Sequence, residues 1–181
     1  MKNKIKKMAI IAIAAVTMGM TANAQEQGDM AVGVNMVGWL TPSYKHVVFG
    51  RVPSYTNIGI GAKFSYNATY LLRFAGEFDY FLEKDYNKFW DLSVYSHYLF
   101  PVATKAVIYP SVGVGMFSIK YSNPNYVGST TSDSRVVFSL GGGSDYELSS
   151  NLILNGEVRY KIFTNVVKNY FNFAIGLAYK F

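Results

Sequence analysis

The chain has 181 residues, of which 50% are hydrophobic, 17% aromatic and only 15% charged, a composition that excludes a disordered tail and an ordinary cytosolic enzyme. It contains no cysteine, which excludes disulfides, thiolate metal sites and cysteine nucleophiles. The formal net charge is +6, but residues 25–181 carry 13 Lys and Arg against 11 Asp and Glu, and this net charge of +2 excludes nucleic acid as a partner on electrostatic grounds.

Residues 1–24 have the three parts of a secretory signal peptide. Four lysines lie within the first seven residues, and a 13-residue apolar segment, Met8 to Met20, follows them. Ala22 and Ala24 then supply the small residues that precede a cleavage site. The apolar segment would span only about 20 Å as a helix, too short for a hydrocarbon layer of about 30 Å. We therefore expect cleavage before Gln25 and a single mature domain, residues 25–181.

The mature chain alternates apolar and polar residues with period 2, which is typical of β-strands with one apolar face. In the last segment, six large apolar residues from Phe171 to Phe181 alternate with small or polar ones without exception. The same pattern occurs seven more times. The eight predicted strands cover residues 30–38, 56–64, 68–81, 89–100, 107–119, 135–147, 152–161 and 171–181.

The composition of the two faces indicates which one points outward. The polar faces are rich in Gly, Ala, Ser and Asn and carry charges of both signs, which suits a narrow lumen better than a solvated surface. The apolar faces carry aromatic residues near both strand ends, as membrane barrels do at the two interfaces. These features predict an all-β protein, an eight-stranded antiparallel up-and-down transmembrane β-barrel. The alternative is a secreted lipocalin-like binding protein with its apolar face inside.

The connections alternate in length in a way that supports a membrane barrel. The links after the second, fourth and sixth strands are short, at residues 65–67, 101–105 and 148–151, whereas residues 39–55 and 120–134 form two long links. We expect the short links and both termini on the periplasmic side. The long external loops then supply the candidates for contact with a protein or surface ligand: Tyr44, Lys45, His46, Arg51, Tyr55, Tyr121, Asn125 and Tyr126.

Three segments carry a resemblance to a known family: Ala178–Phe181 at the C-terminus, Tyr109–Gly115, and Gly141–Gly143. With these segments the mature chain resembles the small eight-stranded outer-membrane β-barrels of the OmpA/OmpX-like type, often called porin family proteins. The resemblance implies a bacterial outer-membrane location, contact with lipid and lipopolysaccharide, and an assembly signal at Tyr179 and Phe181 that the outer-membrane assembly machinery reads. We expect a monomer.

Charged residues of both signs occupy the predicted inward faces. Sorted by predicted depth, opposite signs recur at each level: Lys63, Asp145, Glu147 and Lys180 near the periplasmic end, Arg73, Glu77 and Glu157 in the middle, and Asp79, Asp91, Arg159 and Lys161 near the external end. Because eight strands enclose only enough space for side chains, we expect an ion-pair network that plugs the lumen. The alternative is a gated polar path for small solutes.

The sequence offers few groups for catalysis or metal binding. His46 lies in the first long loop near Ser43 and Ser54, and His97 is predicted to point into the lumen, but no spacing matches a catalytic site or a metal cluster. We therefore predict no enzyme activity, metal or cofactor. The function predicted is a structural or surface-interaction role through the long external loops; a small-solute porin and the lipocalin-like binder are the alternatives.

Overall fold

The computed structural model describes residues 26–41, 44–46, 50–52, 54–84, 87–122, 130–164 and 169–181. Over these residues the chain is built from β-strands and turns, without a helix. None of the described segments is a helix long and apolar enough to cross a membrane.

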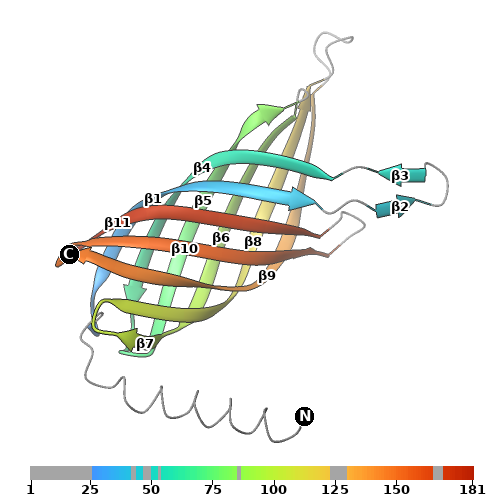
Figure 1. The fold of residues 1–181 in the computed structure, drawn as a ribbon. Helices are drawn as coiled ribbons and strands as arrows, with labels where there is room; N and C mark the ends of the chain where they lie inside the picture. Colours follow the sequence, from blue (N-terminus) through green and yellow to red (C-terminus); the bar gives the residue numbers. More distant parts are fainter. Residues whose placement is uncertain are drawn as a thin grey trace, which may run out of the picture.

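The strands form one closed antiparallel barrel and a separate two-stranded hairpin (Figure 1). Their bounds are β1 Met30–Thr41, β2 Tyr44–His46, β3 Gly50–Val52, β4 Tyr55–Asn67, β5 Leu72–Lys84, β6 Asn87–Tyr98, β7 Phe100–Ala103, β8 Ala106–Ser122, β9 Thr130–Ser149, β10 Leu152–Phe163 and β11 Tyr170–Lys180. The sheet runs β6-β5-β4-β1-β11-β10-β9-β8-β7, and the pairing of β6 with β8 closes it. β7 continues β6 beyond Leu99 and pairs with β8. When β6 and β7 are counted as one strand, the barrel wall has eight strands.

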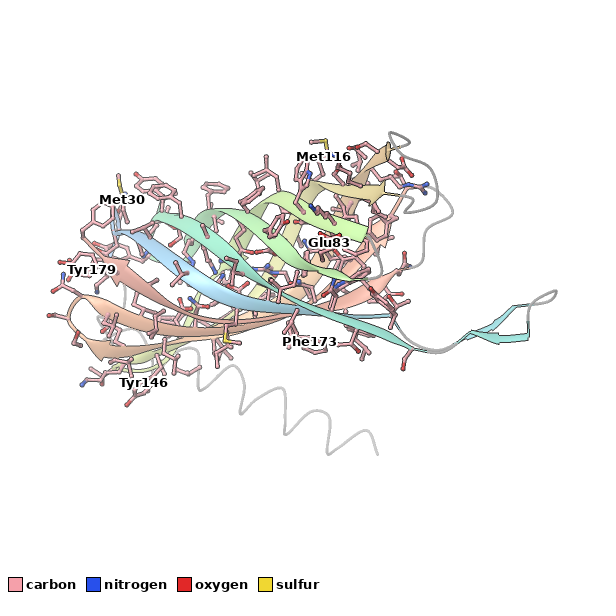
Figure 2. All side chains as sticks on the ribbon, turned by 90° about the horizontal axis from the view of Figure 1, so that it is seen from above. Met30, Glu83, Met116, Tyr146, Phe173 and Tyr179 are labelled. Carbon is pink, nitrogen blue, oxygen red and sulfur yellow. The ribbon has the colours of Figure 1, made fainter. Side chains whose placement is uncertain are left out.

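The apolar faces of the strands point outward, as predicted. Figure 2 shows the side chains of Met30, Met116 and Phe173 projecting from the barrel, and Val34 and Met36 are 69% and 67% exposed. The inward faces are buried and mostly polar or charged. The lipocalin-like alternative required the reverse and is wrong, because an exposed apolar belt of this extent is stable only against lipid.

The two ends of the barrel differ in their connections. At one end, here the turn end, lie the start of β1, the C-terminus and short links such as Thr104–Lys105 and Ser150–Asn151. At the other end, the loop end, β1 and β4 are joined through the β2–β3 hairpin, which projects beyond the barrel wall (Figure 1). The two long predicted links lie at the loop end, although strands extend into both. The predicted alternation is not strict, because only residues 85–86 separate β5 from β6 at the loop end, whereas residues 68–71 separate β4 from β5 at the turn end.

One boundary difference concerns the start of the third predicted strand. We expected it to begin at residue 68, but β5 begins at Leu72. The hydroxyl of Thr69 accepts hydrogen bonds from the backbone N–H groups of Leu71 and Leu72, at 3.2 and 2.9 Å. A side-chain acceptor thus closes a turn where the alternation alone suggested a strand.

Candidate functional site

The lumen is the part of the molecule where polar groups converge, and its turn end is closed by apolar side chains. Leu99, Val107 and Tyr109 form one buried cluster there, and a second contains Ala31, Ile153 and Ala178. At the same end, the Lys180 ammonium lies 2.8 Å from Glu147 and 3.7 Å from Asp29 in a half-buried cluster.

Above these clusters, Arg73 forms the first fully buried ion pair. Its Nη1 lies 2.5 Å from Oδ2 of Asp145, and its Nε donates to Nδ1 of His97 at 3.1 Å. The Tyr109 ring stacks on the His97 ring at 4.6 Å, and its hydroxyl donates to Asp145 and Glu157. Arg73 therefore has charge-assisted and aromatic partners on several sides.

The middle of the lumen holds four charges in one connected set. Two nitrogens of Arg159 bond to both oxygens of Glu77, at 2.5 and 2.7 Å, which is the bidentate geometry that guanidinium favours. Lys63 lies 3.4 Å from Glu77, and both Lys63 and Arg159 also pair with Glu157. The Arg159 guanidinium lies 4.0 Å from the centre of the Tyr95 ring.

Nearer the loop end, Lys161 and Asp91 form the last buried ion pair. The Lys161 ammonium lies 2.7 Å from Oδ1 of Asp91, which also accepts a 2.5 Å bond from the Ser93 hydroxyl. Asp79 lies directly opposite Asp91 on the neighbouring strand. Within the described part of the chain, neither carboxylate oxygen of Asp79 has a hydrogen-bond partner.

Most of these ion pairs cross the lumen. Glu77, Lys63 and Asp91 belong to β4–β6, whereas their partners Glu157, Arg159 and Lys161 all belong to β10. Because the strands bring opposite walls together only when the barrel closes, these pairs tie one half of the wall to the other. Side chains that bridge the lumen also occupy the space that a solute path would need.

The loop end of the lumen is filled by aromatic residues. Trp39 lies at the centre of this layer, with ring-centre distances of 4.9 Å to Tyr170, 5.2 Å to Phe89 and 5.9 Å to Phe117. We call the following residues the aromatic layer: Val37, Trp39, Phe81, Phe89, Phe117, Val137, Phe163, Tyr170 and Ala174, with Tyr55 and Ile119 packed against them. An apolar layer of this kind excludes water from the polar lumen beneath it.

The aromatic layer was missed from the sequence, although a signal for it was present. Trp39 has the same alternation phase as Asn35, and Phe117 has the same phase as Gly115, so both point inward. We ended the predicted strand at residue 38 and assigned Trp39 to a loop. Extending the alternation by one or two residues would have placed Trp39, Phe163 and Tyr170 inside the barrel. Phe117 already lay in the predicted strand 107–119, on its inward face.

Three depth predictions were wrong. Arg73 lies near the turn end, since β5 begins at Leu72. Lys63 belongs to the middle set because it lies directly opposite Glu77 in the strand register. Arg159 also joins the middle, where it reaches Glu77. Because the strands are tilted and staggered, residues at the same fraction of their strand's length lie at different depths in the barrel. Long side chains then move the charged groups further from the depth of their own backbone.

Glycines make room for the large lumen side chains. A Cβ atom on Gly143 would lie 2.7 Å from Cγ of Glu157 and 2.8 Å from Cζ of Tyr109. Gly143 therefore lets two side chains from neighbouring strands cross above β9. The Gly141–Gly143 segment thus serves close packing, as expected for glycine inside a strand.

The external-loop candidates are placed unevenly. Lys45 and Arg51 are paired directly opposite each other in the β2–β3 hairpin, where Tyr44 and His46 also lie, but only their backbone is described. Tyr55 begins β4, and its ring packs against Trp39 at 5.6 Å. Tyr121 is placed by its backbone in β8, whereas Asn125 and Tyr126 lie outside the described residues.

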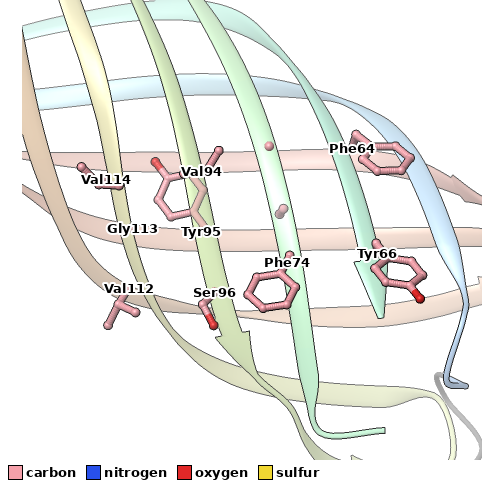
Figure 3. A pocket seen from close by; sticks show the side chains of 11 residues that line it. Phe64, Tyr66, Phe74, Val94, Tyr95, Ser96, Val112, Gly113 and Val114 are labelled. Atoms are coloured by element: carbon pink, nitrogen blue, oxygen red, sulfur yellow. The ribbon is translucent and has the colours of Figure 1, made fainter. Parts of the chain in front are cut away.

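A hollow of about 630 Å³ lies on the outer wall of the barrel (Figure 3). Outward side chains such as Phe64, Phe74 and Val114 line it, and Gly76 leaves space there, since no atom lies within 4 Å of the position of its absent Cβ. Because most of its lining belongs to the membrane-facing surface, this hollow is not a solute path.

The described residues contain no group of three or more His, Asp or Glu side chains that could hold a metal ion. His97 is fully buried, between Arg73 and Tyr109. The geometry can therefore hold opposite walls together and exclude water.

Comparison with known structures identifies the same fold elsewhere. Neisserial surface protein A is similar with a TM-score of 0.64 and 16% identity, over 85% of this chain and 98% of that one. Ail, the attachment invasion locus protein of Yersinia pestis, has a TM-score of 0.61 and 16% identity over 86% and 99%. OprG from Pseudomonas aeruginosa has a TM-score of 0.63 and 13% identity over 87% and 98%. No curated protein matches the sequence.

The model of the outer membrane protein beta-barrel domain matches residues 9–181, almost the entire chain. Together with the closed eight-stranded barrel, this match confirms the resemblance and the location inferred from the sequence. The chain belongs to the family of outer membrane protein beta-barrel domains, and it is a β-barrel protein of the bacterial outer membrane.

Proposed function

We propose that this protein is a closed, non-conducting barrel whose loop end faces the outside of the cell and contacts anionic surface groups. The observation that carries the first part is the layering of the lumen, with the aromatic layer above ion pairs that cross from wall to wall. Water and ions would have to displace both layers to pass. A structural and surface-contact role fits this geometry better than transport of small solutes.

Single-channel recording in planar bilayers tests the closed state. We expect the purified barrel to insert and remain silent. Stable openings whose conductance changes in Glu77→Gln or Arg73→Gln would contradict the proposal and favour the gated porin, since both residues face the lumen.

The proposal places both termini and the short turns in the periplasm. This orientation is supported by the even number of strands in the barrel wall, which leaves the start of β1 and the end of β11 at the same end of the barrel. Since the chain has no cysteine, single-cysteine variants can test it on intact cells. A membrane-impermeant maleimide should label Lys45→Cys and leave Lys105→Cys unlabelled; the reverse would invert the orientation.

Charge is distributed unevenly between the loop end and the rest of residues 25–181. The loop-end segments 42–54, 83–88, 118–135 and 164–169 contain seven Lys and Arg but three Asp and Glu, whereas the rest of residues 25–181 has six against eight. Two cations, Lys45 and Arg51, occupy directly opposite register positions in the hairpin. Like charges placed opposite each other destabilise a strand pair, and an anion between them would relieve this repulsion.

Anionic groups with this chemistry include sulfated or phosphorylated sugars. Ail has been crystallised in complex with the heparin analogue sucrose octasulfate, and that chain is 16% identical to this one with a TM-score of 0.63. The shared fold, the basic loop end and the hairpin register support a similar ligand class here. Lipopolysaccharide phosphates would present the same chemistry in the outer leaflet.

Binding to immobilised heparin oligosaccharide tests this ligand class. The double variant Lys45→Gln/Arg51→Gln should weaken binding roughly tenfold at low salt, about 1.4 kcal/mol, and added salt should weaken the wild type similarly. Lys105→Gln, which removes a cation from the turn end, is the matched control and should bind like the wild type. Equal binding by all three proteins would remove the hairpin from the proposal.

The C-terminal strand carries the proposed assembly signal. Tyr179 and Phe181 are exposed on the outer wall, where the assembly machinery could contact them. Phe181→Ala should lower the amount of heat-modifiable barrel in the outer membrane, while the same variant refolds normally into detergent. Normal membrane levels would contradict this role.

The remaining parts of the proposal concern activity and assembly state. We propose no catalytic role, and a monomer surrounded by outer-membrane lipid and lipopolysaccharide. Light scattering with correction for bound detergent should give the mass of one chain; a stable dimer would contradict the monomer.

A further inference from the structure

The buried charges of the lumen do not balance. Sorted by their ion pairs, Arg73 and Asp145 form a neutral group, and Lys63, Arg159, Glu77 and Glu157 form a second neutral group. The third group contains one cation, Lys161, and two carboxylates, Asp91 and Asp79. With His97 and the tyrosines neutral and Asp79 ionised, the lumen carries one negative charge more than its cations offset, and this excess lies directly beneath the aromatic layer.

Asp79 is the carboxylate that lacks a partner. It is 1% exposed, and both of its oxygens are without a hydrogen-bond partner among the described residues, whereas Asp91 has Lys161 and Ser93. A Cβ atom on Gly61 would lie 2.2 Å from Oδ1 of Asp79. The carboxylate therefore lies over the glycine of the neighbouring strand, away from the like charge of Asp91.

A second unpartnered side chain lies along the same cross-strand row. Asn35 is directly opposite Gly61, which is directly opposite Asp79. Asn35 is 3% exposed, and neither atom of its side-chain amide has a partner among the described residues. Buried polar groups are almost always bonded to protein, water or an ion. The Asn35 amide oxygen lies over Gly176 of β11, on the other side of β1, so the unmet polar group over Gly61 is the Asp79 carboxylate.

We propose that Asp79 binds one monovalent alkali cation, Na⁺ or K⁺, inside the sealed lumen. One positive charge restores neutrality to the third group, whereas a divalent ion would leave an uncompensated buried charge, which is costly. The available ligands are the carboxylate oxygens of Asp79, which suit hard cations, and water molecules complete the coordination. Asp79 is the anchoring ligand, and its carboxylate lies over Gly61.

The site lies between two barriers. The aromatic layer closes it from the loop end, and the Arg159–Glu77 pair lies on the other side. The cation must then enter as the barrel closes and leave slowly afterwards. The proposal does not depend on what the external loops bind, and it requires only that the lumen is sealed.

The test is refolding from denaturant into detergent with a single type of cation present. Wild-type protein refolded at pH 8 with NaCl or KCl should have a higher apparent melting temperature than protein refolded with choline chloride at equal ionic strength. The difference should grow with the logarithm of the alkali cation concentration, as expected for a ligand that binds only the folded state. Asp79→Asn, which removes the charge at almost unchanged volume, should lose the difference.

Asp133→Asn is the matched control, because Asp133 is an exposed carboxylate paired with Arg135 at the loop end. It should keep the full cation dependence. The proposal is overturned if the wild type is equally stable in choline, or if Asp79→Asn retains the dependence. Crystals grown with Rb⁺ provide a check without a variant: an anomalous peak beside the Asp79 carboxylate is expected, and its absence would also overturn the proposal.

Discussion

The aromatic layer and the ion pairs next to it are built from the same strands but have opposite chemical character. On β10, Glu157, Arg159 and Lys161 point inward and form ion pairs, while Phe163, two residues further on, belongs to the aromatic layer. On β6, Phe89 belongs to the aromatic layer and Asp91 to the ionic part. A single step of the alternation thus separates a dry apolar layer from a charged one.

This difference shows what each layer contributes to the barrel. In a soluble protein, burial of apolar surface directs the core inward; here lipid solvates the outer wall, so the lumen needs satisfied polar groups more than apolar ones. The ionic layers hold opposite walls together at long range. The aromatic layer fills the lumen where it would otherwise meet external water, and it protects the ion pairs below from screening.

The largest expected effect is the loss of a buried carboxylate. Glu77→Ala leaves the Arg159 guanidinium without its bidentate partner and weakens the position of Lys63. Removing one member of a buried pair typically costs about 3–5 kcal/mol. Urea unfolding in lipid vesicles should show this loss. A loss below about 1 kcal/mol would mean that water reaches the middle layer.

A somewhat smaller effect is expected in the aromatic layer. Trp39→Ala removes the central ring and leaves a cavity among Tyr170, Phe89 and Phe117, which should destabilise the barrel by about 3 kcal/mol. Trp90→Phe, on the outer wall, is the control and should cost far less. Because the ionic layers remain, Trp39→Ala should still be silent in planar bilayers; openings in this variant would assign the seal to the aromatic layer alone.

Two glycines allow a matched test of packing. Gly143→Ala places a methyl group against Glu157 and Tyr109 and should cost about 1–3 kcal/mol. Gly156→Ala should cost nothing measurable, because no atom lies within 4 Å of its Cβ position. Equal unfolding midpoints for the two variants would show that the side chains around Gly143 can move to accept a methyl group at little cost.

The smallest effect is expected for an ion pair outside the lumen. Lys88 lies 3.2 Å from Glu83 at the loop end, where both side chains are nearly half exposed. Such pairs contribute about 0–1 kcal/mol, so Lys88→Met should leave the unfolding free energy almost unchanged. Comparison with Glu77→Ala then measures how much more an ion pair contributes to the unfolding free energy inside the lumen than outside it.

Much of the fold could be predicted from alternation because the rule is local. Residues 171–181 place Phe173 outward and Asn172 inward whatever their neighbours are, since successive strand residues point to opposite faces. The strand count and the positions of the two long links follow in the same way. The prediction was wrong at residues 68–71, where the Thr69 hydroxyl accepts hydrogen bonds from backbone N–H groups and so forms a turn in place of a strand.

By itself, the sequence determined the eight strands, their two faces, the membrane-facing side and the identity of the inward charges. Only the tertiary structure decided which charges meet. Lys63 and Glu157 are 94 positions apart, and Arg159 and Glu77 are 82 apart, so their pairing depends on register, tilt and closure of the barrel. The same closure gathers Trp39, Phe117 and Tyr170 from three strands into one layer, because no local rule states which inward residues share a height.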